Sequence, residues 1–146
     1  NSVVEGQIIQ ALYRASQAGV EVKLIVRGIC SLRPGIEGVS DNIEVRSVIG
    51  RFLEHTRVYM FENGGSPEVY AASADIMNRN MFRRVEACFP IEHKVLKARV
   101  LADLDLYLKD NAGSWIMQSD GSYVQNIPEG EAYQAQAVLM EQYSAK

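Results

Sequence analysis

One histidine of this 146-residue chain stands among residues that could handle a phosphate group. His55 lies in GRFLEHTRVYMFE, just before a run typical of a strand, and side chains at strand ends commonly line a crevice. Arg57 follows two positions later, and Glu62 five positions after that. A histidine can attack phosphorus or carry a proton, and an arginine can hold phosphate oxygens. A hydrogen-bonded structural role for His55 remains the alternative.

Arg27 is the second candidate, because it ends the apolar run at residues 22–26 and is followed by Gly28 and a long loop. Arginine presents a planar fork of donors that matches phosphate oxygens, and glycine lets another group come close to the backbone. These features predict a site for a phosphate-bearing ligand at the end of the strand. A salt bridge from Arg27 to Glu37 or Asp41 is the competing interpretation.

A further group of polar residues lies in SADIMNRN and in RRVE. We expect Asn78 and Asn80 in a turn after a strand, and Arg84 near the start of the next strand. An ion pair between Arg84 and Glu86, which share a strand face, competes with a site role. We therefore predict that Asn78, Asn80 and Arg84 support the site from its edge, together with Arg57 and Glu62.

Alternating helices and strands must position these residues. Apolar spacing and turn signals predict helices at 3–18, 92–110 and 131–144, strands at 22–26, 43–49, 57–62, 68–73 and 83–91, and a small hairpin around 119–121. This order predicts an α/β fold in which a mixed β-sheet is flanked by helices. We expect one domain over residues 1–146, with the hairpin and terminal helix of 111–146 appended to it.

The composition is that of an ordinary globular protein. Hydrophobic residues make up 47% and charged residues 23%, which excludes a disordered or fibrous chain. No apolar run is long enough to span a membrane, and two cysteines do not make a secreted disulfide framework, so we expect a cytoplasmic protein. The chain begins at Asn1 with no initiator methionine, and we expect a piece of a longer protein.

The charge is unevenly distributed along the chain. Residues 1–100 carry 13 Lys and Arg against 11 Asp and Glu, whereas residues 101–146 carry 2 against 7. Ten of the 13 cations in the first part are arginines, a bias that favours an anionic partner. A nucleic acid is disfavoured, because the net charge is −3 and the cations form no run.

Two resemblances follow from these motifs. His55, Arg57 and Glu62 resemble the His-x-Lys-x-x-x-x-Asp pattern of the phospholipase D superfamily, with a same-charge residue at the second and third positions. The segments LIVRGICSLRPG, GRFLEHTR, SADIMNRN and RRVEACFPI together resemble the C-terminal domain of bacterial polyphosphate kinase. The similarity covers at least residues 5–110 and extends less specifically over 111–146.

The resemblance implies a specific chemistry. That family transfers the γ-phosphoryl group of ATP reversibly to inorganic polyphosphate, leaving ADP, through a phosphohistidine and with Mg²⁺. By resemblance, Arg27 and His55 are the ATP-phosphate-binding and catalytic residues of this domain. The phosphorylated histidine and the magnesium-binding residues would lie in preceding domains of the same enzyme, which is expected to be a homo-oligomer, so the isolated fragment should be inactive. A stand-alone polyanion-binding module and a dimeric phosphodiesterase on the same fold are the alternatives.

Overall fold

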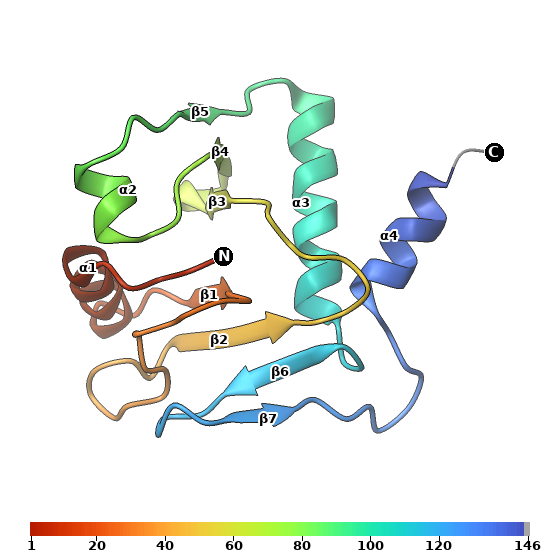
Figure 1. The fold of residues 1–146 in the computed structure, drawn as a ribbon, viewed down its shortest axis with the longest axis horizontal. Helices are drawn as coiled ribbons and strands as arrows, with labels where there is room; N and C mark the ends of the chain where they lie inside the picture. Colours follow the sequence, from red (N-terminus) through yellow and green to blue (C-terminus); the bar gives the residue numbers. More distant parts are fainter. Residues whose placement is uncertain (145–146) are drawn as a thin grey trace.

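The computed structural model describes residues 1–144 and has an α/β architecture, in which helices surround two β-sheets (Figure 1). The helices are α1 (Gly6–Gln17), α2 (Asn78–Phe82), α3 (Lys94–Lys109) and α4 (Ala135–Tyr143). The strands are β1 (Val22–Ile25), β2 (Ile43–Val48), β3 (Val58–Phe61), β4 (Glu68–Ala72), β5 (Cys88–Pro90), β6 (Ser114–Met117) and β7 (Tyr123–Gln125). The predicted fold class is confirmed.

The first sheet is mixed and has the strand order β1-β2-β6-β7. β1 and β2 run parallel, with Val22 opposite Ile43 and Ile25 opposite Arg46, while β6 and β7 join antiparallel. Strand β2 has a neighbouring strand on each edge. Its side chains alternate between buried and half-buried as far as Arg46, and Ser47 and Val48 are both buried. Arg27 follows the end of β1 and therefore lies at the edge of this sheet.

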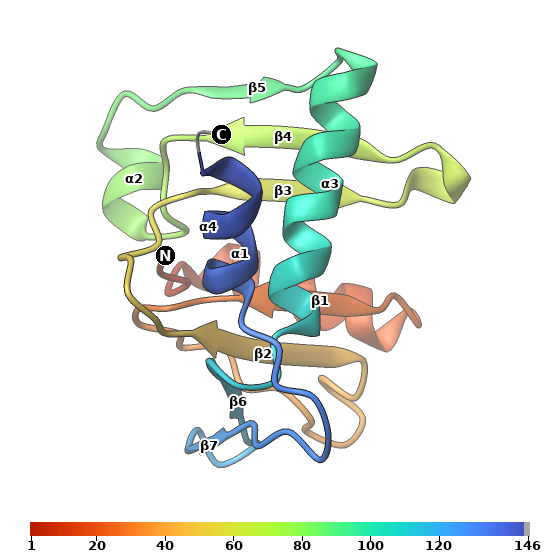
Figure 2. The ribbon, with the colours of Figure 1, turned by 90° about the vertical axis from the view of Figure 1, so that its right-hand side faces the viewer.

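The second sheet is an antiparallel meander of β3, β4 and β5. The turn NGGSP joins β3 to β4, and its tip places Asn63, Gly64 and Gly65 at positive φ values of 46°, 61° and 88°. β3 begins at Val58 and ends at Phe61, so Arg57 and Glu62 flank the strand instead of lying in it. The two sheets lie one above the other in Figure 2, with α3 alongside both.

The N-terminal segment joins the two sheets. Val3 forms isolated β-bridges to Cys30 on one side and to Ile76 on the other. The Val3 amide donates to the Ile29 carbonyl at 2.8 Å, and the Ile76 amide donates to the Ser2 carbonyl at 3.0 Å. The expected mixed sheet therefore consists of two sheets with an extended segment between them.

The main core lies between α1 and the first sheet. It consists of the buried side chains Val3, Ile9, Val26, Leu32, Ile43, Val45 and Met117. Full burial of an aliphatic side chain of this kind contributes about 1.5–3 kcal/mol. Helix α1 begins at Gly6 because the Glu5 carboxylate accepts a hydrogen bond from the Ile8 amide at 2.9 Å.

Two predictions for the segment between β4 and β5 are wrong. Asn78 and Asn80 lie in the short helix α2 and not in a turn, since the Met77 carbonyl accepts from the amides of Asn80 and Met81, each at 3.0 Å. The expected strand at 83–91 begins only at Cys88, which pairs with Ala72. Because β4 ends at Ala72, the residues before Cys88 have no strand to pair with.

Helix α3 lies across the molecule from the second sheet to the first (Figure 1). Arg46 of β2 donates through Nη1 to the Leu108 carbonyl, and a cation at this place stabilises the helix C-terminus. The apolar side chains Val95 and Leu96 at the other end are 70% and 57% exposed. Among the described residues, no helix is long and apolar enough to cross a membrane.

Candidate functional site

Arg27 and His55 meet at the edge of the first sheet, although 28 residues separate them in the sequence. The Arg27 Nη2 lies 3.4 Å from the His55 Nε2, and the Arg27 Nε donates to the backbone carbonyl of Glu54. Arg27 therefore binds the backbone of the residue just before the histidine. Arg27 is half-buried, and the imidazole of His55 is exposed. Neither Glu37 nor Asp41 takes Arg27 as an ion-pair partner within the described residues.

Arg57 holds the backbone of His55. Its Nη1 donates to the His55 carbonyl at 2.7 Å, and its Nε donates to the Asp75 Oδ1 at 2.9 Å. Asp75 is only 6% exposed and also accepts from the Asn1 Nδ2 at 3.0 Å. Burial opposes ionisation of Asp75, but the hydrogen bonds from Arg57 and Asn1 outweigh it and hold the pKa of this carboxyl below its usual value.

A second cluster lies at the start of α2. The Glu86 carboxylate accepts from the Asn80 Nδ2 at 2.6 Å and from the Ser73 hydroxyl. These two hydrogen bonds, with the charges of Arg84 and Arg57, lower the pKa of Glu86. Since the charge of Arg57 acts on both carboxylates, the two clusters lie within electrostatic range of each other. The buried Asn80 Oδ1 has no hydrogen-bond partner within residues 1–144.

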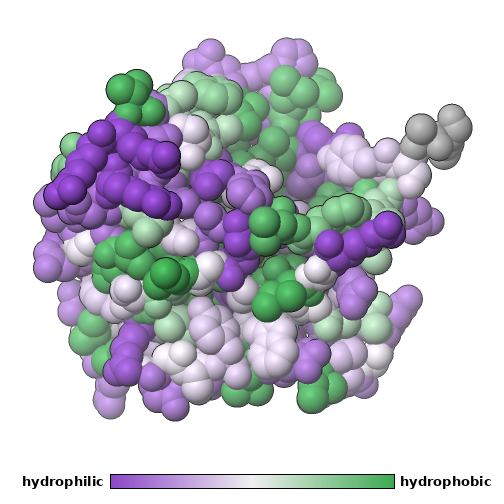
Figure 3. Space-filling model, in the orientation of Figure 1, coloured by the Kyte–Doolittle hydropathy of each residue, from purple (hydrophilic) through white to green (hydrophobic). Residues whose placement is uncertain are grey.

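The remaining predicted residues lie further out. Glu62 lies at the opposite end of β3 from Arg57, about 16.5 Å away over five residue steps of roughly 3.3 Å each. Asn78 and Arg84 are exposed, and Arg84 acts on Glu86 through its charge. Figure 3 shows hydrophilic side chains gathered over α2 and the segment after it, where Arg79, Arg83 and Arg84 are exposed.

Sequence reasoning missed two supporting residues. Asp75 lies within SADIMNRN, and a carboxylate directly after a strand was the available signal. Glu54 lies beside the histidine, but no local pattern marks it. Gly28 does allow another group to come close to its backbone, as predicted, but that group is not a ligand. A Cβ at Gly28 would lie 2.6 Å from the Asn1 carbonyl oxygen, so the chain's own backbone fills that space.

The donor set around His55 does not fit a magnesium ion. Mg²⁺ prefers carboxylates, phosphates and water, whereas Arg27 and Arg57 bring positive charge to the site and Asp75 is engaged by Arg57. Within the described residues, no group of three or more His, Cys, Asp or Glu side chains could hold a metal ion. The chemistry that this site offers is recognition of an anion and hydrogen bonding or proton transfer by an imidazole.

This arrangement of sheets and helices is that of a phospholipase D-like α/β domain. It superposes on a crystal structure of polyphosphate kinase from Porphyromonas gingivalis with a TM-score of 0.93 and 36% sequence identity, over 97% of this chain and 22% of that one. The family model described as polyphosphate kinase C-terminal domain 2 matches residues 1–136. The chain belongs to this family.

Curated relatives agree with this assignment. A polyphosphate kinase of Pseudomonas syringae pv. tomato is 57% identical over 146 residues, which is 99% of this chain and 20% of the relative. One from Burkholderia vietnamiensis is 59% identical over 124 residues, 84% of this chain and 18% of the relative. The chain thus spans about a fifth of the length of the curated relatives that it matches. The resemblance inferred from the sequence motifs is confirmed.

Proposed function

We propose that this domain forms one wall of the site in which polyphosphate kinase transfers a phosphoryl group between ATP and inorganic polyphosphate. The observation that carries the proposal is the meeting of Arg27 and His55 at 3.4 Å on an exposed edge. The names of the relatives, which are polyphosphate kinases, support the same chemistry. The stand-alone module and the phosphodiesterase have no observation in their favour.

Arg27 and His55 take different roles in this proposal. Arg27 uses the nitrogens that are left free by its bond to Glu54 to hold phosphate oxygens. His55 donates a hydrogen bond or a proton to the oxygen that leaves phosphorus when the bond to the γ-phosphoryl group of ATP breaks and ADP departs. Phosphoryl transfer requires mainly positioning and neutralisation of charge, which an arginine and an imidazole supply.

Other parts of the enzyme complete the reaction. The covalent phosphoryl acceptor and Mg²⁺ belong to preceding domains in this proposal, which agrees with the poor fit of the described donors to a metal. Cys30 and Cys88 are both free thiols, which suits a reducing compartment such as the cytoplasm. The whole enzyme is expected to be a homo-oligomer.

The test is His55→Ala in the full-length enzyme that carries this domain. Turnover should fall by about 10²-fold or more, which is typical for the loss of an acid–base group. ADP release and polyphosphate length would be followed with ATP and Mg²⁺ present. His93→Ala is the matched control, because His93 is exposed at the start of α3 and its loss should leave turnover unchanged. Equal turnover in His55→Ala and the control would refute the proposal.

A further inference from the structure

The loop that presents His55 is held by one side chain of the C-terminal helix. Gln136 of α4 is 7% exposed. Its Oε1 accepts from the Phe52 amide at 2.9 Å, and its Nε2 donates to the Phe52 carbonyl at 2.8 Å. A Cβ at Gly50 would collide with this amide group. The glutamine thus binds the backbone of residue 52 as a neighbouring strand would, three residues before the histidine.

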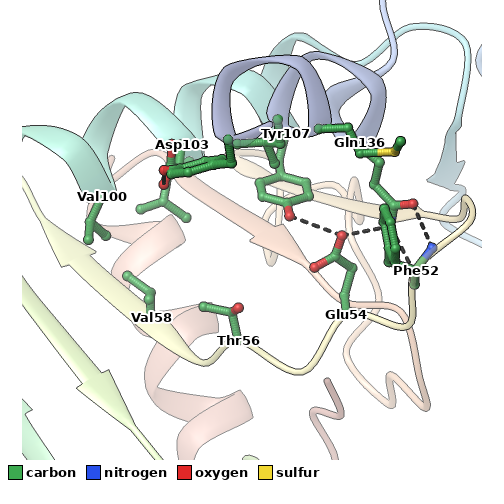
Figure 4. Close-up of a pocket in the computed structure, with 12 residues that line it drawn as sticks. Phe52, Glu54, Thr56, Val58, Val100, Asp103, Tyr107 and Gln136 are labelled. Carbon is green, nitrogen blue, oxygen red and sulfur yellow. Dashed lines mark hydrogen bonds between the residues drawn. The ribbon is translucent and has the colours of Figure 1, made fainter. Parts of the chain in front are cut away.

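The same glutamine reaches the residue next to His55. Its Nε2 also donates to the Glu54 Oε1 at 2.7 Å, and the Tyr107 hydroxyl of α3 donates to the same oxygen at 2.9 Å. Burial, and then the hydrogen bond to Glu54, raises the pKa of Tyr107 well above its usual value, so this hydroxyl keeps its proton. Figure 4 shows the three side chains converging, with dashed lines joining Tyr107, Glu54, Gln136 and Phe52.

Glu54 is the point at which these contacts reach the candidate site. Its side chain is held by Gln136 and Tyr107, while its backbone carbonyl accepts from the Arg27 Nε. The position of this one residue therefore sets where Arg27 is anchored. It also sets where the backbone of His55 begins.

Gln136 is itself fixed in place. Asp110, at the end of α3, is 1% exposed, and its Oδ2 accepts from the Ala135 amide at 2.8 Å, at the first residue of α4. At the other end of α4, the Tyr143 hydroxyl donates to Asp103 of α3 at 2.7 Å. Two anchors therefore hold the helix and place Gln136 over the loop.

A groove of about 370 Å³ runs beneath this contact, and Val58, Val100 and Leu104 are among the apolar residues that line it. Figure 4 shows Glu54 and Tyr107 pointing toward each other at its edge. Because the loop has empty space beside it, apolar packing alone does not fix its position, and the polar contacts with Gln136 and Tyr107 carry that task.

We propose that Gln136 and Tyr107 are positioning residues, which hold Glu54 and through it set the relative placement of Arg27 and His55. The inference rests on the proposed function, since it assumes that this pair acts on phosphate. The C-terminal helix then takes part in phosphoryl transfer without touching the substrate. A displacement of about 1 Å in a reacting group can lower a rate by about 10²-fold.

The experiment uses the full-length enzyme with Gln136→Met, Gln136→Glu and Tyr107→Phe, and with Gln142→Met as the control on the exposed part of α4. Gln136→Met keeps the length of the side chain and removes its hydrogen bonds. We expect kcat to fall about tenfold or more, while KM for ATP changes less. Tyr107→Phe should lower kcat by a smaller factor, since Gln136 still holds Glu54, and the control should match the wild type.

Gln136→Glu gives a readout that a purely structural role would not give. Two carboxylates would then share the 2.7 Å contact, which raises the pKa of one of them. Protonation as the pH falls restores a donor, so kcat relative to wild type should recover severalfold between about pH 8 and pH 6. The charged and titratable groups around this contact are Arg27, Arg51, His55, Asp103, Tyr107, Asp110 and Tyr143. All are common to both enzymes, so the ratio removes their own titration.

The outcomes separate the two proposals. Wild-type kcat in Gln136→Met, or a pH profile of Gln136→Glu that runs parallel to wild type, overturns the positioning role. If Gln136→Met does not fold, as thermal unfolding would show, Gln136→Glu and Tyr107→Phe decide the question. His55→Ala is measured alongside: if it keeps full turnover, the proposed function itself fails. If His55→Ala is inactive and the Gln136 variants are fully active, only the positioning role is wrong.

Discussion

Asp75→Asn tests how much the ion pair between Asp75 and Arg57, which binds the backbone of His55, contributes to stability. The wild-type carboxylate accepts from Arg57 at 2.9 Å and from Asn1 at 3.0 Å while only 6% exposed. Asparagine has the same shape and keeps one acceptor oxygen, but it has no charge. Arg57, whose side chain is 20% exposed, then has no partner of opposite charge in direct contact.

The expected loss follows from these contacts. A hydrogen bond to a charged group contributes about 1.5–3 kcal/mol to the free energy of unfolding. The partial exposure of Arg57 lets water replace some of that, so we take about 2 kcal/mol. For a chain of this size, 1 kcal/mol corresponds to roughly 2–4 °C. Asp75→Asn should therefore unfold about 4–8 °C below the wild type at pH 7.

The pH dependence has a defined sign. The folded pKa of Asp75 lies below its ordinary value, and an unfolded aspartate has a pKa of about 3.9. The unfolded state therefore binds more protons in this range, and the contribution of Asp75 is fully present above about pH 5. It disappears as the pH falls through the folded pKa. The difference between wild type and Asp75→Asn should shrink below about pH 4.

Thermal unfolding followed by circular dichroism measures both effects on the 146-residue chain. Asp105→Asn is the matched control, because Asp105 pairs with Lys109 on the surface and is 53% exposed, and such pairs contribute about 0–1 kcal/mol. Equal melting temperatures for Asp75→Asn and wild type at pH 7, or a difference that grows as the pH falls, would contradict the role assigned to Asp75.

Two further predictions concern activity. In the full-length enzyme, Arg27→Ala should weaken binding of ATP phosphates by roughly 10–100-fold, and Arg27→Lys should not restore it because the planar fork is lost; near-normal affinity and turnover in Arg27→Ala would remove this residue from the site. The isolated chain should fold and bind polyphosphate weakly but transfer no phosphoryl group, as followed by ADP release with ATP, Mg²⁺ and polyphosphate; sustained turnover that disappears in His55→Ala would mean that this chain holds a complete site.

Most elements of the fold could be predicted because their signals are local. The hairpin at NGGSP requires positive φ at its tip, and glycines at 64 and 65 supply it. The apolar run at β1 and the amphipathic pattern of α1 are complete within about a dozen residues. The predicted start of β5 was wrong because the length of this strand depends on where its partner β4 ends.

The contacts of the candidate site join residues that are far apart in the sequence, so local signals predict them poorly. Arg27 and His55 were each recognisable from type and position, but only the family resemblance placed them together. The partner of Arg57 is Asp75, which follows the end of a separate strand. The contact between Glu54 and Gln136 spans 82 residues, and no periodicity or turn signal links positions that far apart.

The strand order has a consequence for how the chain folds as it leaves the ribosome. β2 ends at Val48, but the strand that covers its second edge, β6, begins only at Ser114. A nascent chain that stops between them exposes a row of unpaired backbone groups on a strand that carries the apolar side chains Ile43, Val45 and Val48, which is a template for aggregation. Completion of the first sheet must therefore wait for the last quarter of the sequence. Helix α4, which holds the histidine loop through Gln136, is synthesised after β6, so a chain truncated before Ser114 would lose solubility and site geometry together.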